Sequence, residues 1–64
     1  MIPDLDVYRA AHLLLERHGA DAEIVAAQRV DEMTERQDYE GRYIWMMVKR
    51  AIVELQAPPT GPLH

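Results

Sequence analysis

The chain contains no cysteine among its 64 residues. Disulfides, zinc sites built on thiolates, thiol redox chemistry and cysteine nucleophiles are therefore excluded. The absence also bears on stability, because a 7.4 kDa chain can build only a small hydrophobic core. A core of this size supplies roughly 3–5 kcal/mol, and natural proteins of similar length usually add disulfides, a metal or oligomerisation.

Targeting segments and long apolar runs are also missing. Residues 1–6 include two aspartates and lack the basic start and the apolar stretch of a signal peptide. No segment approaches the roughly 18–20 apolar residues that cross a membrane. The sequence therefore predicts a cytoplasmic protein that does not enter a membrane.

Catalytic motifs are absent: the sequence has no glycine-rich phosphate loop, no nucleophile elbow and no paired-histidine metalloprotease helix. His12 and Glu16 are four residues apart, a spacing that can place two metal ligands on one helical face, but no third ligand accompanies them. The acidic residues between positions 31 and 40 favour a solvated surface over an enclosed carboxylate site. We therefore predict a protein that is not an enzyme and that holds no metal or cofactor.

The net charge of -4 is unevenly distributed along the chain. Residues 20–40 contain seven acidic and two basic side chains, whereas residues 41–64 contain three basic and one acidic. The third helix has a basic edge formed by Arg42, Lys49 and Arg50. Together with the three short helices, this edge is similar to that of helix-turn-helix DNA-binding proteins. The acidic middle segment would repel a phosphate backbone, so a small DNA-binding regulator is kept only as the alternative function.

Cap residues divide the chain into helices. Asp4, Asp21 and Asp38 suit N-cap positions, because a carboxylate can accept hydrogen bonds from the unpaired amides of the first turn. Gly19 suits the left-handed residue that ends a helix. The prediction is an all-α fold of three helices at residues 4–18, 21–36 and 38–56. The short connection between the first two helices favours near-antiparallel neighbours.

The segment after the third helix is rich in proline. Pro58, Pro59 and Pro62 cannot continue a helix, so we expect residues 57–64 to be a flexible tail. Such a tail can bind aromatic grooves, but disorder explains it without a partner. Residues 1–56 are then a single domain.

Each predicted helix has one apolar side with spacings of three, four and seven residues. The side of the first helix contains Val7, Tyr8, Ala10, Ala11, Leu14 and Leu15. The side of the second helix is small: Ala22, Ala26, Ala27, Val30 and Met33. The third helix contributes Ile44, Trp45, Val48, Ala51, Ile52 and Leu55. Gly41 falls on this last side, which predicts close packing against the alanines of the second helix.

The third helix has more apolar surface than one small core can use. Its unbroken run from Tyr43 to Val48 spreads around the axis, because a helix advances about 100° per residue. The predicted contact residues are the apolar and basic side chains on the side away from the core: Tyr39, Tyr43, Met46, Met47, Val53, Arg42, Lys49 and Arg50. Methionine and tyrosine are favoured at protein contacts.

Two arrangements would cover this extra surface. In one, the third helix lies centrally, with the first helix on one side and the second on the other. In the other, a second molecule covers it, and the protein is an interaction module, most simply a homodimer through the third helix. We expect the second arrangement, in which the covering molecule is a second copy of the chain or a different helical protein.

Two sets of residues resemble known helical proteins. Asp38-Tyr39-Glu40 followed by Ala51 is similar to the second helix of a tetratricopeptide repeat, although Ala51 comes late and 64 residues cannot hold the usual three copies. A longer set covers nearly the whole helical region: Arg17-His18-Gly19-Ala20-Asp21-Ala22, Ala26-Ala27, Arg29, Asp31, Glu32, Asp38, Gly41, Trp45, Ala51-Ile52 and Glu54-Leu55. With these residues the chain resembles a family of short uncharacterised alphaproteobacterial proteins. The resemblance implies a bacterial cytoplasmic origin and transfers no catalytic residue.

Overall fold

The computed structural model describes residues 4–57, which form three α-helices, one short 3-10 turn and no β-strand. The elements are α1 (Asp4–His18), η1 (Gly19–Asp21), α2 (Ala22–Glu35) and α3 (Tyr39–Gln56). The all-α prediction is confirmed, and each predicted helix boundary lies within one residue of the observed boundary. The predicted tail, apart from Ala57, lies outside the described residues.

The predicted cap residues behave differently from one another. Gly19 has a φ of 54°, the left-handed conformation expected at the end of α1. Asp38 caps α3, and its carboxylate accepts a hydrogen bond of 2.9 Å from the Gly41 amide. Asp21 occupies the N-cap of α2 but makes no side-chain capping bond. Its backbone (φ -88°, ψ 0°) continues the 3-10 turn and lacks the extended conformation usual at an N-cap.

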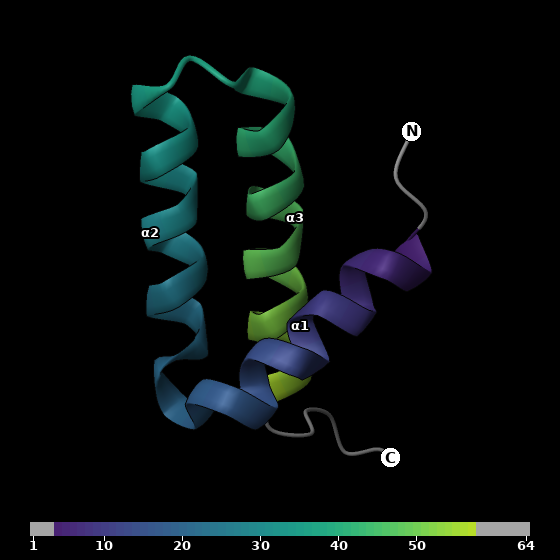
Figure 1. Ribbon diagram of the computed structural model, residues 1–64. Helices are drawn as coiled ribbons and strands as arrows, with labels where there is room; N and C mark the ends of the chain where they lie inside the picture. Colours follow the sequence, from purple (N-terminus) through teal and green to yellow (C-terminus); the bar gives the residue numbers. More distant parts are fainter. Residues whose placement is uncertain (1–3, 58–64) are drawn as a thin grey trace.

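Residues 36–38 connect α2 to α3 through a Schellman motif. The Asp38 amide donates to the Met33 carbonyl at 2.8 Å, and the Gln37 amide donates to the Thr34 carbonyl at 3.0 Å. Gln37 supplies the left-handed residue of the motif, with a φ of 60°. The connection is so short that α2 and α3 form a hairpin of adjacent antiparallel helices (Figure 1).

Gly41 lies where the first turn of α3 approaches the end of α2. A Cβ at this position would lie 2.7 Å from an Asp38 carboxylate oxygen and 2.8 Å from the Met33 sulfur. The predicted close packing is therefore present, but the α2 residue involved is Met33. The buried alanines, Ala22 and Ala26, lie in the half of α2 that is distant from this connection.

Helix α3 contacts both other helices, and α1 contacts α3 more extensively than it contacts α2. Figure 1 shows α1 running obliquely across α3 and diverging from α2 toward its N-terminus. The prediction that α1 and α2 are near-antiparallel neighbours is therefore wrong. The physical reason is the connection: the left-handed Gly19 turns the chain, and η1 then leads directly into α2, so no reversing loop separates the two helices.

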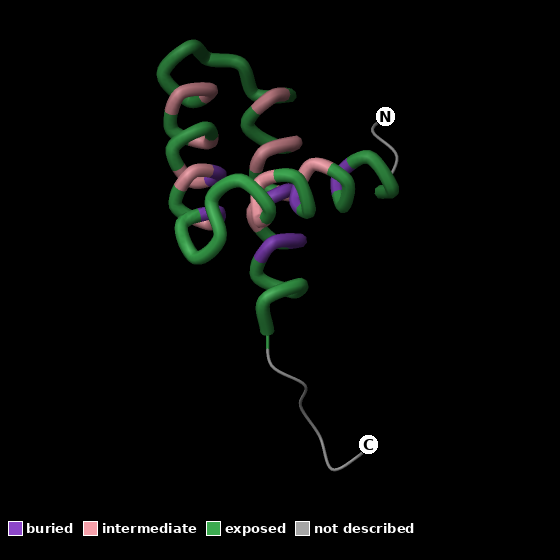
Figure 2. Tube along the Cα trace, turned by 60° about the horizontal axis from the view of Figure 1, so that its bottom comes forward, coloured by how far each residue is buried: buried purple, intermediate pink, exposed green. Residues whose placement is uncertain are grey.

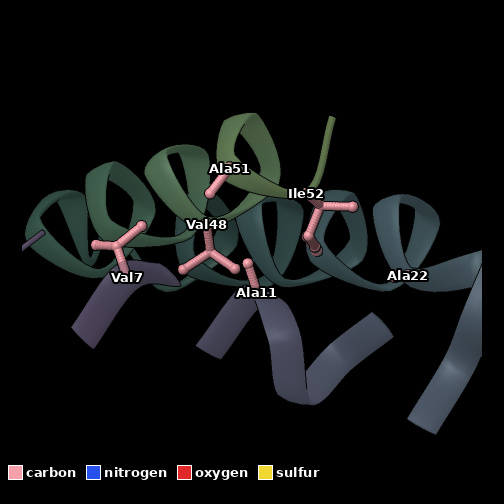
Figure 3. Close-up of a cluster of buried hydrophobic side chains, with 7 residues drawn as sticks. Val7, Ala11, Ala22, Val48, Ala51 and Ile52 are labelled. Carbon is pink, nitrogen blue, oxygen red and sulfur yellow. The ribbon is translucent and has the colours of Figure 1, made fainter. Parts of the chain in front are cut away.

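The core lies where α1 crosses the α2–α3 hairpin. Within residues 4–57, seven hydrophobic side chains are buried: Val7, Ala11, Ala22, Ala26, Val48, Ala51 and Ile52. Figure 3 shows Val7 and Ala11 of α1 facing Val48 of α3. Four of the seven are alanines, whose single methyl groups each gain little from burial. The fold therefore depends on a weak core.

Burial is confined to one end of the α2–α3 hairpin. No residue from position 27 to position 47 is buried, and Figure 2 shows only half-buried and exposed residues toward the connection at 36–38. Trp45 packs half-buried against the core. Leu55, predicted in the core, is 39% exposed because the last turn of α3 extends past the start of α2. Tyr8 is also exposed, at the edge of the α1–α3 contact.

Candidate protein-binding face

Seven residues of α3 form a continuous face that α1 and α2 leave largely uncovered. Their spacings of three, four and seven residues place them on one side of the helix. This exposed α3 face consists of Tyr39, Arg42, Tyr43, Met46, Lys49, Arg50 and Val53. Its apolar members are widely accessible: Tyr39 is 66% exposed, Tyr43 64%, Met46 44% and Val53 45%.

The first of the two arrangements considered from the sequence, a central third helix, describes one side of α3 and leaves the other side uncovered. Helix α3 lies against both α1 and α2, and their contacts cover the side that carries Val48 and Ile52. The contacts do not extend to Met46 or Val53 on the other side. An uncovered apolar face with a charged border is typical of a protein contact surface.

Met47 differs from the other predicted contact residues. Its side chain is half-buried and packs against the buried core. It lies about 100° around the helix axis from Met46, in the direction of α1. The structure thus groups Met47 with the core and separates it from the exposed α3 face.

An open groove of about 470 Å³ runs between α1 and α3 along one edge of the exposed α3 face. The Tyr8 hydroxyl donates a 2.6 Å hydrogen bond to the Glu54 carboxylate at the rim of this groove. The Arg50 Nε atom lies 3.5 Å from the other carboxylate oxygen of Glu54. The remaining residues of the groove come from both helices: Asp4, Val7, Tyr43, Met46, Met47 and Ala51.

The hydrogen bond to Glu54 raises the pKa of Tyr8 above its ordinary value of 10.0. The nearby negative charge of Glu54 adds to the effect. Loss of the phenolic proton would remove the donor and place a second negative charge beside the carboxylate. The two side chains therefore link α1 to α3 as long as Tyr8 is protonated.

A second open groove of about 470 Å³ runs between α2 and α3 along the other edge of the face. No residue of α1 lines this groove. The lining residues come from α2 and α3: Glu23, Ala27, Val30, Asp31, Arg42, Met46, Lys49, Arg50 and Val53. The α2 wall carries acidic side chains, the α3 wall carries basic ones, and the remaining lining residues are apolar. Met46 and Arg50 line both grooves, so the exposed α3 face forms the ridge between them.

The α2 wall was not predicted from the sequence as part of a contact surface. Glu23, Ala27 and Asp31 line the groove, and Ile24 is 57% exposed. Ile24 precedes Ala27 by three residues and Asp31 by seven, which places it on the same side of α2. The sequence feature that indicates this wall is Ile24, a large apolar residue that lies outside the side of α2 formed by small residues.

Residues 4–57 were predicted to hold no metal and to enter no membrane. Within residues 4–57, no group of three or more His, Cys, Asp or Glu side chains is placed to hold a metal ion. His12 and Glu16 lie one turn apart on α1, and both are exposed. No helix in the same part of the chain is long and apolar enough to cross a membrane.

The candidate site is therefore a surface of α3 bordered by two grooves. Its distinguishing properties are the exposed apolar residues and the opposite charges on the walls of the α2–α3 groove. The chain matches no protein-family model, no curated protein and no solved structure.

Proposed function

We propose that the protein is a non-enzymatic, self-associating helical module, most simply a homodimer, with the exposed α3 face as its contact surface. The observation that carries this proposal is the exposure of Tyr39, Met46 and Val53 on one side of the helix. These residues recur every seven positions, so a second helix could pack along all three at once. Burial of such side chains contributes roughly 25 cal/mol per Å² of apolar surface.

The composition of the core supports the same proposal. Only three of the seven buried side chains, Val7, Val48 and Ile52, are larger than alanine. Proteins of this size usually need a further source of stability, and the chain has no cysteine for a disulfide. Association would provide that stability by removing the exposed α3 face from water.

The proposed interface also accounts for the basic residues of the exposed α3 face. Arg42 and Arg50 are exposed beside the apolar residues and would form the polar rim that surrounds the core of most interfaces. The absence of cysteine and the resemblance to alphaproteobacterial proteins favour the bacterial cytoplasm as the location.

The DNA-binding alternative receives less support. Arg42, Lys49 and Arg50 share a groove with Glu23 and Asp31, which would repel phosphate groups approaching the basic residues. DNA binding would predict a salt-sensitive complex with duplex DNA that weakens in the double variant Lys49→Glu, Arg50→Glu. We expect no complex even at low salt.

The proposal is tested by placing a charge in the middle of the face. Met46→Asp should abolish self-association, because the carboxylate would be desolvated without a partner. Leu13→Asp is the matched control: Leu13 is 46% exposed, close to the 44% of Met46, but lies on α1 outside both grooves. Light scattering at high micromolar concentration gives the mass of each variant, and circular dichroism confirms its helix content.

Two results would contradict the proposal. One is a wild-type protein that is monomeric and well folded at these concentrations. The other is equal association of Met46→Asp and wild type, which would place the contact elsewhere on the molecule. Loss of association in Leu13→Asp but not in Met46→Asp would assign the contact to α1.

A further inference from the structure

We propose that the partner on the α2–α3 groove is a second copy of this chain, bound so that α3 of each copy packs against α2 of the other. This inference rests on the proposed self-association and specifies its geometry. The dimer would be a four-helix bundle made from two α2–α3 hairpins, with α1 of each copy on the outside.

The α2–α3 groove lies on the side of the hairpin opposite α1. Val48 faces α1 in Figure 3. Val53 and Met46 lie roughly 140–160° around the α3 axis from Val48, at about 100° per residue. No residue of α1 lines this groove. Two copies can therefore meet through it without displacing α1.

Four of the residues that line the groove are apolar. Ala27 and Val30 from α2 and Met46 and Val53 from α3 line it. Ile24, 57% exposed, adds a large side chain on the same side of α2. These residues span both helices, so the surface offered to a partner is a two-helix layer. Four-helix bundles form when such layers pack face to face.

The charges on the two walls are opposite and do not pair across the groove. The acidic wall on α2 has Glu23 and Asp31, and the basic wall on α3 has Arg42 and Lys49. The ion pairs within residues 4–57 join Asp6 to Arg9, Arg29 to Glu32, and Arg50 to Glu54. All four wall residues are thus available to a partner that presents a basic wall to α2 and an acidic wall to α3. A second copy of this chain has both walls.

Two different twofold axes could relate the copies, and the charges discriminate between them. An axis perpendicular to the helices would place α3 on α3 and α2 on α2, so that basic walls meet basic walls and acidic walls meet acidic walls. An axis parallel to the helices places α3 on α2 of the other copy, so that opposite charges meet. Unlike charges stabilise an interface and like charges destabilise it, which selects the parallel axis.

The hairpin also fixes the register of this arrangement. Because the connection is centred on Gln37, positions equidistant from it lie at the same height on α2 and α3. Asp31 is thus level with the region of Arg42, and Glu23 is level with the region of Lys49 and Arg50. A twofold axis parallel to the helices preserves these heights. Arg42 would then meet Asp31 of the second copy, and Lys49 would meet Glu23.

Charge reversal on one wall tests the inference. A variant with Arg42→Glu and Lys49→Glu has two acidic walls, and its association at low salt should be at least about tenfold weaker than that of wild type. The matched control carries Arg9→Glu and Arg36→Glu, which make the same change in net charge at exposed positions outside both grooves. The control should retain most of the wild-type affinity.

A swap of both walls separates the two axes. The variant with Arg42→Glu, Lys49→Glu, Glu23→Lys and Asp31→Lys should associate with itself about as tightly as wild type, and should form few mixed dimers with wild type. The axis perpendicular to the helices predicts that the swapped variant prefers mixed dimers with wild type, because those dimers would bring walls of opposite charge together. Fluorescence energy transfer between differently labelled copies measures the mixed fraction.

Each outcome has a distinct meaning. Poor mixing with strong self-association supports α3 packing on α2 of the other copy. Preferential mixing with wild type, or unchanged association after reversal of the basic wall, overturns this geometry while the exposed α3 face remains the contact surface. A monomeric wild type overturns the proposed function together with this inference.

Discussion

Gln37 holds the left-handed conformation that ends α2. It is the one non-glycine residue with a positive φ between positions 4 and 57. The conformation brings a Cβ close to the following carbonyl oxygen and costs roughly 1–2 kcal/mol. The hydrogen bonds of the Gln37 and Asp38 amides to α2 offset this cost. The side chain of Gln37 is exposed, so no packing explains the choice of glutamine.

Gln37→Gly should therefore stabilise the fold. Glycine removes the Cβ strain, although its larger entropy in the unfolded chain offsets part of the gain, leaving about 0.5–1 kcal/mol. Gln37→Ala keeps the Cβ and should change the free energy of unfolding by only a few tenths of a kcal/mol. Urea denaturation at one fixed protein concentration compares the three proteins. Equal stability of the glycine and alanine variants would show that the turn carries no strain.

Residue type made some of the helix ends predictable and left others hidden. Gly19 and Asp38 have strong positional preferences, and both take the expected roles. Glutamine has no preference for the left-handed region, so the role of Gln37 depends on hydrogen bonds that appear only once α2 and α3 are formed. Asp21 has the right side chain for a cap, but the backbone of η1 directs it away from that role.

A hydrogen bond from Tyr8 of α1 to Glu54 of α3 connects the two helices at the exposed edge of their contact. The pKa of Tyr8 is raised mainly by the hydrogen bond to Glu54. Because the folded-state pKa exceeds the unfolded one, the link stabilises the fold below about pH 10 and is lost as the pH rises through the folded-state value. The attachment of α1 should therefore weaken in strongly alkaline solution.

Glu54→Gln should lower the pKa of Tyr8 toward its ordinary value, because the neutral amide removes both the negative charge and the stronger acceptor. An NMR titration of ζ-carbon-labelled tyrosine measures the pKa, and Tyr8→Phe assigns the signal. Glu40→Gln is the control, since Glu40 is an exposed carboxylate of α3 outside the α1–α3 groove. An unchanged pKa in Glu54→Gln would mean that the hydrogen bond is not populated in solution.

The helices themselves were predictable, but their arrangement was predictable only in part. Cap residues and apolar spacing are local properties, which explains the accurate boundaries of α1, α2 and α3. The angle between α1 and α2 depends on the geometry of one turn at Gly19, which the sequence does not specify. The helical projection predicted most of the exposed α3 face, but Met47 packs against the core, because it lies on the side of α3 that α1 borders.

For the whole molecule, folding and association should be coupled. The core is confined to the crossing of α1 with one end of the hairpin, and no residue between positions 27 and 47 is buried. The rest of the α2–α3 hairpin lacks a third layer in the monomer (Figure 2). A second hairpin would supply that layer. The opposite charges of the α2–α3 groove would orient it.

The most direct test is the mass of the wild-type protein measured by sedimentation equilibrium from low to high micromolar concentration. Self-association through the exposed α3 face predicts a mass that rises from 7.4 kDa toward twice that value as the concentration increases. A mass of 7.4 kDa at every concentration, for a protein that is helical and folds cooperatively, would contradict it.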